Sequence, residues 1–70
     1  MLRHQVESSN LRSVGYDEAT RTLEIEFHSG GIYQYYDVPP EVYQELLCAP
    51  SLGKYFHAHI RNIYQYKRVG

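Results

Sequence analysis

Residues 21–28 read RTLEIEFH, and this stretch decides the fold. Its apolar residues are Leu23, Ile25 and Phe27. They alternate with Glu24, Glu26 and His28, which is the period-two pattern of a β-strand with one apolar face and one face toward solvent. The turn that follows, residues 29–31 (SGG), contains glycines that tolerate the positive φ angles of a tight hairpin. The stretch therefore predicts a strand that turns back into an antiparallel partner.

Two further strands are expected beside this one. Residues 11–16 form the first, and the polar turn at residues 17–20 connects it to the central strand. Residues 32–38 form the other, and their two faces are less sharply divided, which predicts a β-bulge near Asp37. Residues 64–69 alternate again and predict a short fourth strand at the C-terminus. The chain thus contains a three-stranded antiparallel meander with one short addition.

Two helices are expected after the meander. The first begins at Pro39-Pro40, because proline is well placed in a first helical turn, and it ends at Ala49-Pro50. Ser51 is a good N-cap for the second, which Asn62 closes. The apolar stripes are Val42, Tyr43, Leu46 and Leu47 in the first helix, and Leu52, Tyr55, Phe56, His59, Ile60 and Ile63 in the second. The predicted fold is α+β, a small antiparallel sheet covered on one face by two α-helices.

The composition of the chain predicts one small domain over residues 1–70. One cysteine, Cys48, leaves no internal disulfide, and it is expected to be a small buried residue. No cysteine and histidine spacing resembles a metal site, and no motif indicates a cofactor. The apolar runs are too short for a membrane span, and residues 1–5 lack the apolar centre of a signal peptide, which favours the cytoplasm.

Charge is unevenly distributed along the chain. Residues 17–50 carry seven acidic residues against one arginine, whereas residues 51–70 carry four cations and no acid. The chain also has eight tyrosines and no tryptophan. Tyrosine buries its ring while its hydroxyl reaches water, so most of the eight are expected to be half-buried in a thin core. The uneven charge is typical of a protein that presents a basic face to an anionic partner.

Short motifs run in order along almost the whole chain and resemble one family. They are VESSNL (6–11), VGYD (14–17), LEIEF (23–27), YQY (33–35), VP (38–39), VY (42–43), LL (46–47), APS (49–51), GKYF (53–56) and IR (60–61), with Gly31 and Tyr64. Together they resemble the KTSC domain, a module named for its place at the C-terminus of some lysyl-tRNA synthetases. The module is also common as a short stand-alone protein in bacteria and phages. The resemblance implies a role near RNA.

The last ten residues interleave cations with aromatic rings. We define the C-terminal surface as Arg61, Tyr64, Tyr66, Lys67 and Arg68. Single-stranded RNA needs charge for its phosphates and flat faces for its bases, and both are present here. Alternation places Tyr64, Tyr66 and Arg68 on one side of the strand and Lys67 on the other. In the alternative interpretation, the tyrosines pack on the sheet edge and the cations keep that edge from pairing.

Four other residues are candidates to extend this surface. Tyr36 and Arg12 lie on elements expected to reach it. Ser51 and Lys54 begin the second helix, where unpaired N–H groups favour an anion, and they form a second candidate contact. An ordinary capped helix explains Ser51 and Lys54 equally well.

No catalytic or metal-binding constellation is apparent in the sequence. His57 and His59 are two residues apart, so on a helix they point about 200° from each other and cannot share a metal ion. His59 lies on the apolar stripe and is expected to be a hydrogen-bonded core histidine. Residues 8–10 (SSN) are expected to make turn hydrogen bonds, with no base at a spacing that would activate a nucleophile.

The sequence favours a non-catalytic binding module that contacts RNA or another polyanion through a basic, tyrosine-rich C-terminal surface. The alternative is a protein–protein interaction or oligomerisation module, in which an open sheet edge pairs with a second copy or a host protein. A third hypothesis, a small-molecule enzyme, requires a cleft that contains Ser8, Ser9, Asn10 and a histidine.

Overall fold

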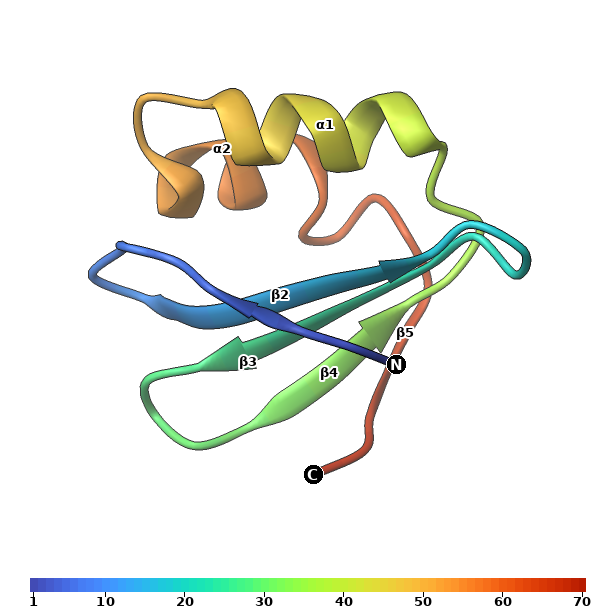
Figure 1. Cartoon of the computed structure of the whole chain (residues 1–70), viewed down its shortest axis with the longest axis horizontal. Coiled ribbons are helices and arrows are strands. Elements are labelled where there is room, and N and C mark those ends of the chain that lie inside the picture. The colour runs from blue at the N-terminus through green and yellow to red at the C-terminus, as the bar shows by residue number, and fades with distance from the viewer.

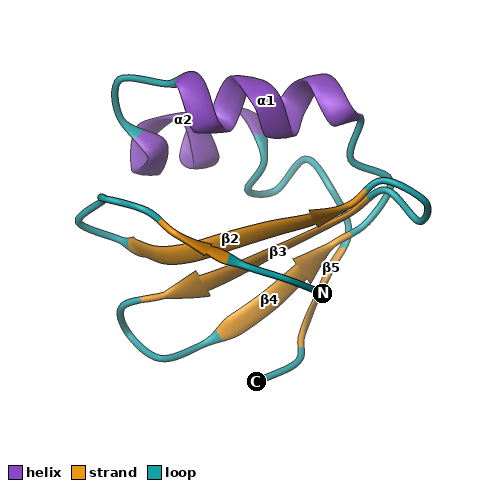
Figure 2. Ribbon diagram, viewed as in Figure 1, coloured by secondary structure: helices purple, strands orange, loops and turns teal.

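The computed structural model describes all 70 residues and consists of one sheet with two helices on one face (Figure 1, Figure 2). The elements are β1 (His4–Gln5), β2 (Leu11–Asp17), β3 (Thr22–Phe27), β4 (Ile32–Tyr35), α1 (Pro40–Cys48), α2 (Leu52–His59) and β5 (Tyr66–Arg68). The strands lie in the order β1-β2-β3-β4-β5, and every neighbouring pair is antiparallel. This arrangement confirms the predicted α+β fold with both helices on one face.

The sheet has five strands, one more than the four that the sequence predicts. The predicted C-terminal strand is present as β5, which pairs with β4. The extra strand is β1, in which His4 pairs with Val14 and Gln5 with Ser13. Two polar residues show no alternation, so the sequence gives no local signal for β1. Its position depends on pairing with β2.

The irregular position in the sheet lies in β2 rather than near Asp37. Leu11 pairs with Phe27 and Ser13 with Glu26, so Arg12 is the extra residue on its strand. The bulge predicted near Asp37 is therefore wrong. Asp37 has a φ of 58° and follows the end of β4, where the left-handed conformation turns the chain toward α1.

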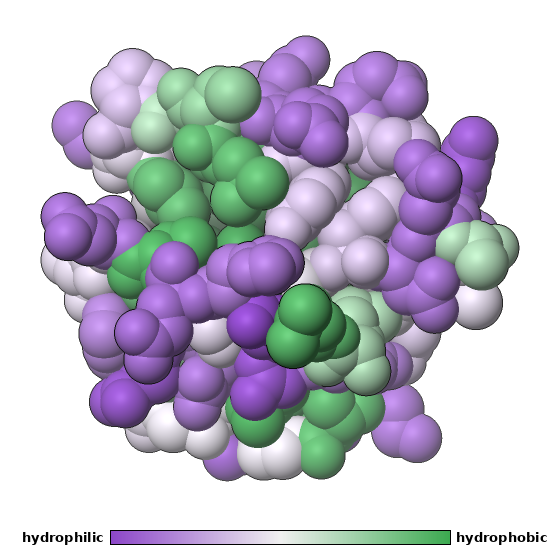
Figure 3. Space-filling model, viewed as in Figure 1, coloured by the Kyte–Doolittle hydropathy of each residue, from purple (hydrophilic) through white to green (hydrophobic).

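The core lies between the sheet and the two helices. Nine hydrophobic residues are buried there: Leu11, Val14, Leu23, Ile25, Tyr35, Val38, Leu46, Phe56 and Ile60. Tyr16 of β2 stacks on Tyr43 of α1 with ring centroids 5.0 Å apart, and its hydroxyl donates to the Val38 carbonyl. On the outside, Figure 3 shows apolar residues as separate patches on a largely hydrophilic face. The apolar residues of the strands and helices therefore meet in one layer, as the alternation in β3 predicts.

The second helix is shorter than its apolar stripe suggests. α2 ends at His59, and the chain then turns through Asn62, whose φ is 64°. Ile63 lies beyond the helix and is 59% exposed, so the prediction that it continues the buried stripe is wrong. Cys48, in the last turn of α1, is exposed, which corrects the expectation that it is buried. Neither α1 nor α2 has the length and the apolar run that a membrane-spanning helix needs.

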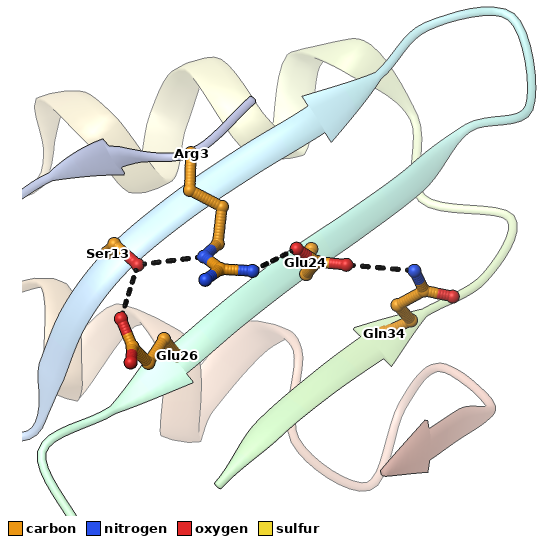
Figure 4. A network of polar contacts seen from close by, with 5 residues as sticks. All are labelled: Arg3, Ser13, Glu24, Glu26 and Gln34. Atoms are coloured by element: carbon orange, nitrogen blue, oxygen red, sulfur yellow. Dashed lines mark hydrogen bonds and ion pairs between the residues drawn. The ribbon is translucent and has the colours of Figure 1, made fainter. Parts of the chain in front are cut away.

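A polar network covers the sheet face that carries no helix (Figure 4). Arg3 donates to Ser13 and forms an ion pair with Glu24, Gln34 also donates to Glu24 at 2.9 Å, and Ser13 donates to Glu26 at 3.0 Å. The alternation places Glu24 on a solvated face, but the side chain is buried, with 9% exposed. The difference arises because Arg3 and Gln34 cover the carboxylate.

Candidate functional site

The structure contains a cleft between α2 and one end of the sheet, with a volume of about 640 Å³. Twelve residues line it: Ser9, Asn10, Phe27, His28, Ser29, Tyr33, Tyr35, Phe56, His57, Arg61, Asn62 and Tyr66. They come from the β1–β2 and β3–β4 connections, from β3, β4 and β5, and from α2 with the turn after it. Segments far apart in the sequence therefore contribute to one hollow.

Five aromatic side chains, which we call the aromatic floor, line this cleft: Phe27, Tyr33, Tyr35, Phe56 and Tyr66. They form a closed ring of neighbouring pairs, with centroid distances between 5.3 and 5.8 Å. Most of these side chains are buried or half-buried, but Tyr66 is 58% exposed. Its ring is therefore the part of the floor most open to a ligand.

The rim of the cleft is polar and contains no carboxylate. Arg61 is exposed and donates to Nδ1 of His57 at 3.2 Å, so its charge faces no acidic partner. His28 lies near the turn before β2, with Nε2 2.9 Å from the Ser8 carbonyl oxygen. An uncompensated cation beside aromatic rings suits an anionic ligand that carries a flat group.

The structure gathers three residues of the C-terminal surface near this cleft. Arg61 and Tyr66 line it, and the Arg68 guanidinium carbon lies 5.9 Å from the centre of the Tyr33 ring. Lys67 pairs with Gln34, which places it on the opposite face of the sheet from Tyr66 and Arg68. The alternation predicted for the last strand is therefore present.

The remaining residues of the predicted surface lie elsewhere. Tyr64 is half-buried and packs against the core. Tyr36 lies on the sheet face that carries no helix, which we call the network face, and its hydroxyl donates to Gln34 at 3.2 Å. Arg12 is exposed at the bulge of β2, and two strands separate it from β5. The residues thus divide between the two faces of the sheet rather than forming one continuous surface.

Ser51 and Lys54 lie in a second, more open hollow at the beginning of α2. The Ser51 hydroxyl accepts a hydrogen bond from the Lys54 backbone N–H at 3.3 Å, which is ordinary helix capping. Tyr55 and His59 also line this hollow, with ring centroids 4.5 Å apart. His59 is exposed, so the expectation of a core histidine is wrong.

Tyr55 makes a strong local contact outside the cleft. Its hydroxyl donates to the Glu45 carboxylate at 2.9 Å and thereby joins α2 to α1. Burial, together with this hydrogen bond and the negative charge of Glu45, raises the pKa of Tyr55 to about 12. The phenol therefore remains protonated at neutral pH and keeps the two helices connected.

The sequence did not single out most of the cleft. The aromatic floor includes Phe27, Tyr33 and Tyr35, which the alternation assigns to one face without showing that they surround a hollow. Ser9 and Asn10 line the cleft beside a turn in which Ser8 accepts hydrogen bonds from the Asn10 and Leu11 amides. The sequence signal for this part of the cleft is the position of residues 8–10, a polar turn directly before the strand that begins at Leu11.

Of the residues that the enzyme hypothesis requires, Ser9, Asn10 and two histidines, His28 and His57, line the cleft, whereas Ser8 does not. The Ser8 hydroxyl accepts hydrogen bonds within its own turn, and no hydrogen bond connects a serine hydroxyl to either cleft histidine. His28 contacts a backbone carbonyl, and His57 accepts from Arg61. No group of three or more histidine, cysteine, aspartate or glutamate residues is placed to bind a metal ion.

Comparison with known proteins finds similarity to solved structures and to two kinds of relative. The crystal structure of a KTSC domain protein from Yersinia pestis superposes with a TM-score of 0.96 at 38% identity, over 99% of this chain and 97% of that one. An uncharacterized protein of Stutzerimonas stutzeri is 49% identical over 70 residues, which is 99% of each chain. The lysine–tRNA ligase of a Nostoc species is 43% identical over 63 residues, which are 90% of this chain and 11% of the ligase.

These matches agree with one another and with the fold. The chain corresponds to a small protein over nearly its full length and to a minor part of a much larger ligase. The KTSC domain matches residues 7–66, and the chain belongs to the KTSC domain family.

Proposed function

We propose that this protein is a small non-catalytic binding module that contacts RNA or another polyanion through its basic, tyrosine-rich C-terminal surface. One observation carries the proposal. Arg61 and the exposed ring of Tyr66 lie at an aromatic cleft that no carboxylate lines, and Arg68 lies over the neighbouring Tyr33 ring.

The physical basis is the combination of charge and flat surface. Arginine guanidinium groups attract phosphates, and exposed rings stack with unpaired bases, which favours single strands over duplexes. Lys67 and Tyr36 lie on the other face near β5 and are candidates for contacts with a strand that crosses the sheet edge. Ser51 and Lys54 remain candidates for a second anion contact, and Arg12 for a distant one.

The relatives provide an RNA context for the proposal. One of them is named as a lysine–tRNA ligase, and most of this chain matches a short part of it. We propose that a module of this kind binds RNA without itself taking part in a reaction. We place the protein in the cytoplasm, where tRNA is found.

Titration of a fluorescent single-stranded RNA tests the proposal. Each phosphate contact contributes a slope of about −0.7 to log K against log salt, so three contacts predict roughly twentyfold weaker binding when salt rises from about 50 to about 200 mM. Arg61→Glu and Arg68→Glu should each weaken binding by about tenfold or more. Arg21→Glu, the same charge change in the β2–β3 turn, is the matched control and should change binding by less than about twofold. Binding that does not depend on salt, or equal losses in all three variants, contradicts the proposal.

The open edges of the sheet support a second candidate function, interaction with a second copy or a host protein. β5 forms one edge with three residues, and the exposed apolar residues Ile63, Tyr66 and Val69 lie in or beside it. An edge strand with free backbone groups can pair with another strand. Lys67 and Arg68 oppose pairing of two identical edges, because their like charges would meet.

A further inference from the structure

Tyr35 is the most deeply buried of the tyrosines that line the cleft, with 5% exposed. Hydrogen bonds within the protein engage the hydroxyls of Tyr16, Tyr36 and Tyr55, whereas the hydroxyl of Tyr35, like those of the remaining tyrosines, has no partner in the protein. No fully buried side-chain polar atom lacks a partner, so this hydroxyl opens onto the cleft that Tyr35 lines. It is therefore free to donate a hydrogen bond to an acceptor from outside the protein.

This hydroxyl is a hydrogen-bond donor at neutral pH. Burial, with smaller contributions from Tyr33 and Tyr66, raises the pKa of Tyr35 to about 12, although Arg61 acts in the opposite direction. The proton therefore remains on the phenol under physiological conditions. Arg61 and Tyr35 line the same cleft, which makes both groups available to one anion.

Arg61 adds a full positive charge that the protein does not neutralise. The only ion pair in the structure joins Arg3 to Glu24, on the other face of the sheet. Arg61 contacts the ring nitrogen of His57, which accepts its hydrogen bond without cancelling its charge. The polar part of the cleft therefore favours an anion that accepts hydrogen bonds, as a phosphate does.

The rest of the cleft favours a flat, partly polar group. The aromatic floor offers ring surface for stacking, and the amide groups of Asn10 and Asn62 at the rim can pair with the edge of a base. A volume of about 640 Å³ falls within the usual range for small-ligand sites. An anion without a ring would leave the aromatic floor uncovered, and a neutral ring would leave Arg61 without a partner.

We propose that the cleft binds one nucleotide unit, with its base against the aromatic floor and its phosphate between Arg61 and the Tyr35 hydroxyl. This inference rests on the function proposed above and specifies its ligand. The same chemistry is present in a free mononucleotide and in a nucleotide at the end of a strand, and the experiment below distinguishes the two sources.

Calorimetric titration of the whole protein with adenosine monophosphate, adenosine and inorganic phosphate tests the proposal. The monophosphate is expected to bind about tenfold or more tightly than adenosine, because only the monophosphate engages both charged hydrogen bonds. Inorganic phosphate should bind more weakly than the monophosphate. Equal affinity for adenosine and its monophosphate, or no binding of the monophosphate at millimolar concentration, overturns the proposal.

Two tyrosine variants isolate the hydroxyl from the ring. Tyr35→Phe keeps the aromatic floor but removes the hydrogen-bond donor. It should therefore weaken binding of the monophosphate by about fivefold or more and leave binding of adenosine unchanged. Tyr55→Phe removes a hydroxyl of similar pKa outside the cleft and should alter neither ligand. Arg61→Gln, which is exposed and should not disturb folding, provides the second test of phosphate binding. If neither Tyr35→Phe nor Arg61→Gln weakens the monophosphate, the proposed geometry is wrong.

Single-stranded RNA with and without a 5′-phosphate separates this inference from the function proposed above. Stronger binding of the phosphorylated strand, reduced by Tyr35→Phe, assigns the cleft to strand ends, whereas tight binding of the free monophosphate alone assigns it to a mononucleotide. If RNA binding depends on salt but changes neither with Tyr35→Phe nor with the 5′-phosphate, the nucleotide site is overturned. The proposal that the C-terminal surface binds RNA is then unaffected. If the protein binds the monophosphate but binds no RNA, the polyanion proposal is overturned instead.

Discussion

Glu24 shows how a single carboxylate can be buried on the face of a sheet that no helix covers. Burial alone would raise its pKa, but the hydrogen bonds from Gln34 and Arg3 and the positive charges of Arg3 and the N-terminus together lower the pKa below its ordinary value. The alternation in residues 21–28 predicts the face of the sheet on which Glu24 lies. It does not predict the burial, because Arg3 is 21 residues away in the sequence.

The lowered pKa of Glu24 makes stability depend on acidity. The folded pKa lies below the unfolded one, so the stabilisation is present above the unfolded pKa of about 4.5 and is lost as the pH falls through the folded pKa. Glu24→Gln should cost about 1–3 kcal/mol at pH 7, because it leaves Arg3 without its ion pair. In this variant, the free energy of unfolding should also change less with pH on the acid side.

Urea denaturation of the wild type and Glu24→Gln between about pH 7 and pH 3 measures both effects. Glu18→Gln, an exposed carboxylate in the β2–β3 turn, serves as the matched control and should change neither the midpoint nor the profile. A Glu24→Gln profile parallel to the wild type at every pH would contradict the assignment.

At the level of elements, the strands β2 to β4 and both helices follow from local pattern, whereas β1, the bulge and the cleft do not. Alternation and capping residues act over a few positions, so they predict β3 and the beginning of α2 well. β1 depends on a partner strand, and the bulge at Arg12 depends on how two strands align. The cleft depends on β3, β4, β5, α2 and the connections beside them meeting, which no single segment encodes.

Gly15 is the residue of β2 that permits β1 to pair. A Cβ at this position would overlap the Leu2 carbonyl and approach Arg3 Cγ to 3.1 Å. Gly15→Ala should therefore displace β1 and weaken the contact of Arg3 with Glu24, at a cost of about 1–3 kcal/mol. The midpoint of urea denaturation measures this cost.

A double-mutant cycle supplies the control for Gly15→Ala. In a chain that lacks residues 1–5, the alanine meets no overlap, so the substitution should have almost no effect on the free energy of unfolding. Equal costs in the full and shortened chains would show that Gly15 acts within β2 and not through β1.

For the whole molecule, the division of charge between an acidic middle and a basic end is kept only in part in space, because Lys67 lies on the same sheet face as Glu24 and Glu26. The acidic side chains Glu24 and Glu26 lie on the network face, whereas Arg61 and Arg68 lie beside the cleft. The radius of gyration of 10.7 Å is that expected for a compact chain of this length. The apolar residues on the face shown in Figure 3 form separate patches, which does not favour a large hydrophobic interface on that side.

Light scattering over a range of concentrations and salt is expected to give the mass of a single chain throughout. The edge strands are short, and the cations of β5 repel a second copy of the same edge. A mass that rises with concentration would favour the oligomerisation module. A rise that salt abolishes would identify contact between the acidic and basic faces as its cause.

The closed ring of five aromatic side chains also gives the protein an intrinsic optical signal. Because the chain has no tryptophan, its ultraviolet emission comes from tyrosine, and three of the eight emitters belong to the aromatic floor. A base stacked on Tyr66 would quench that emission directly. Occupancy of the cleft can therefore be followed in the unlabelled protein.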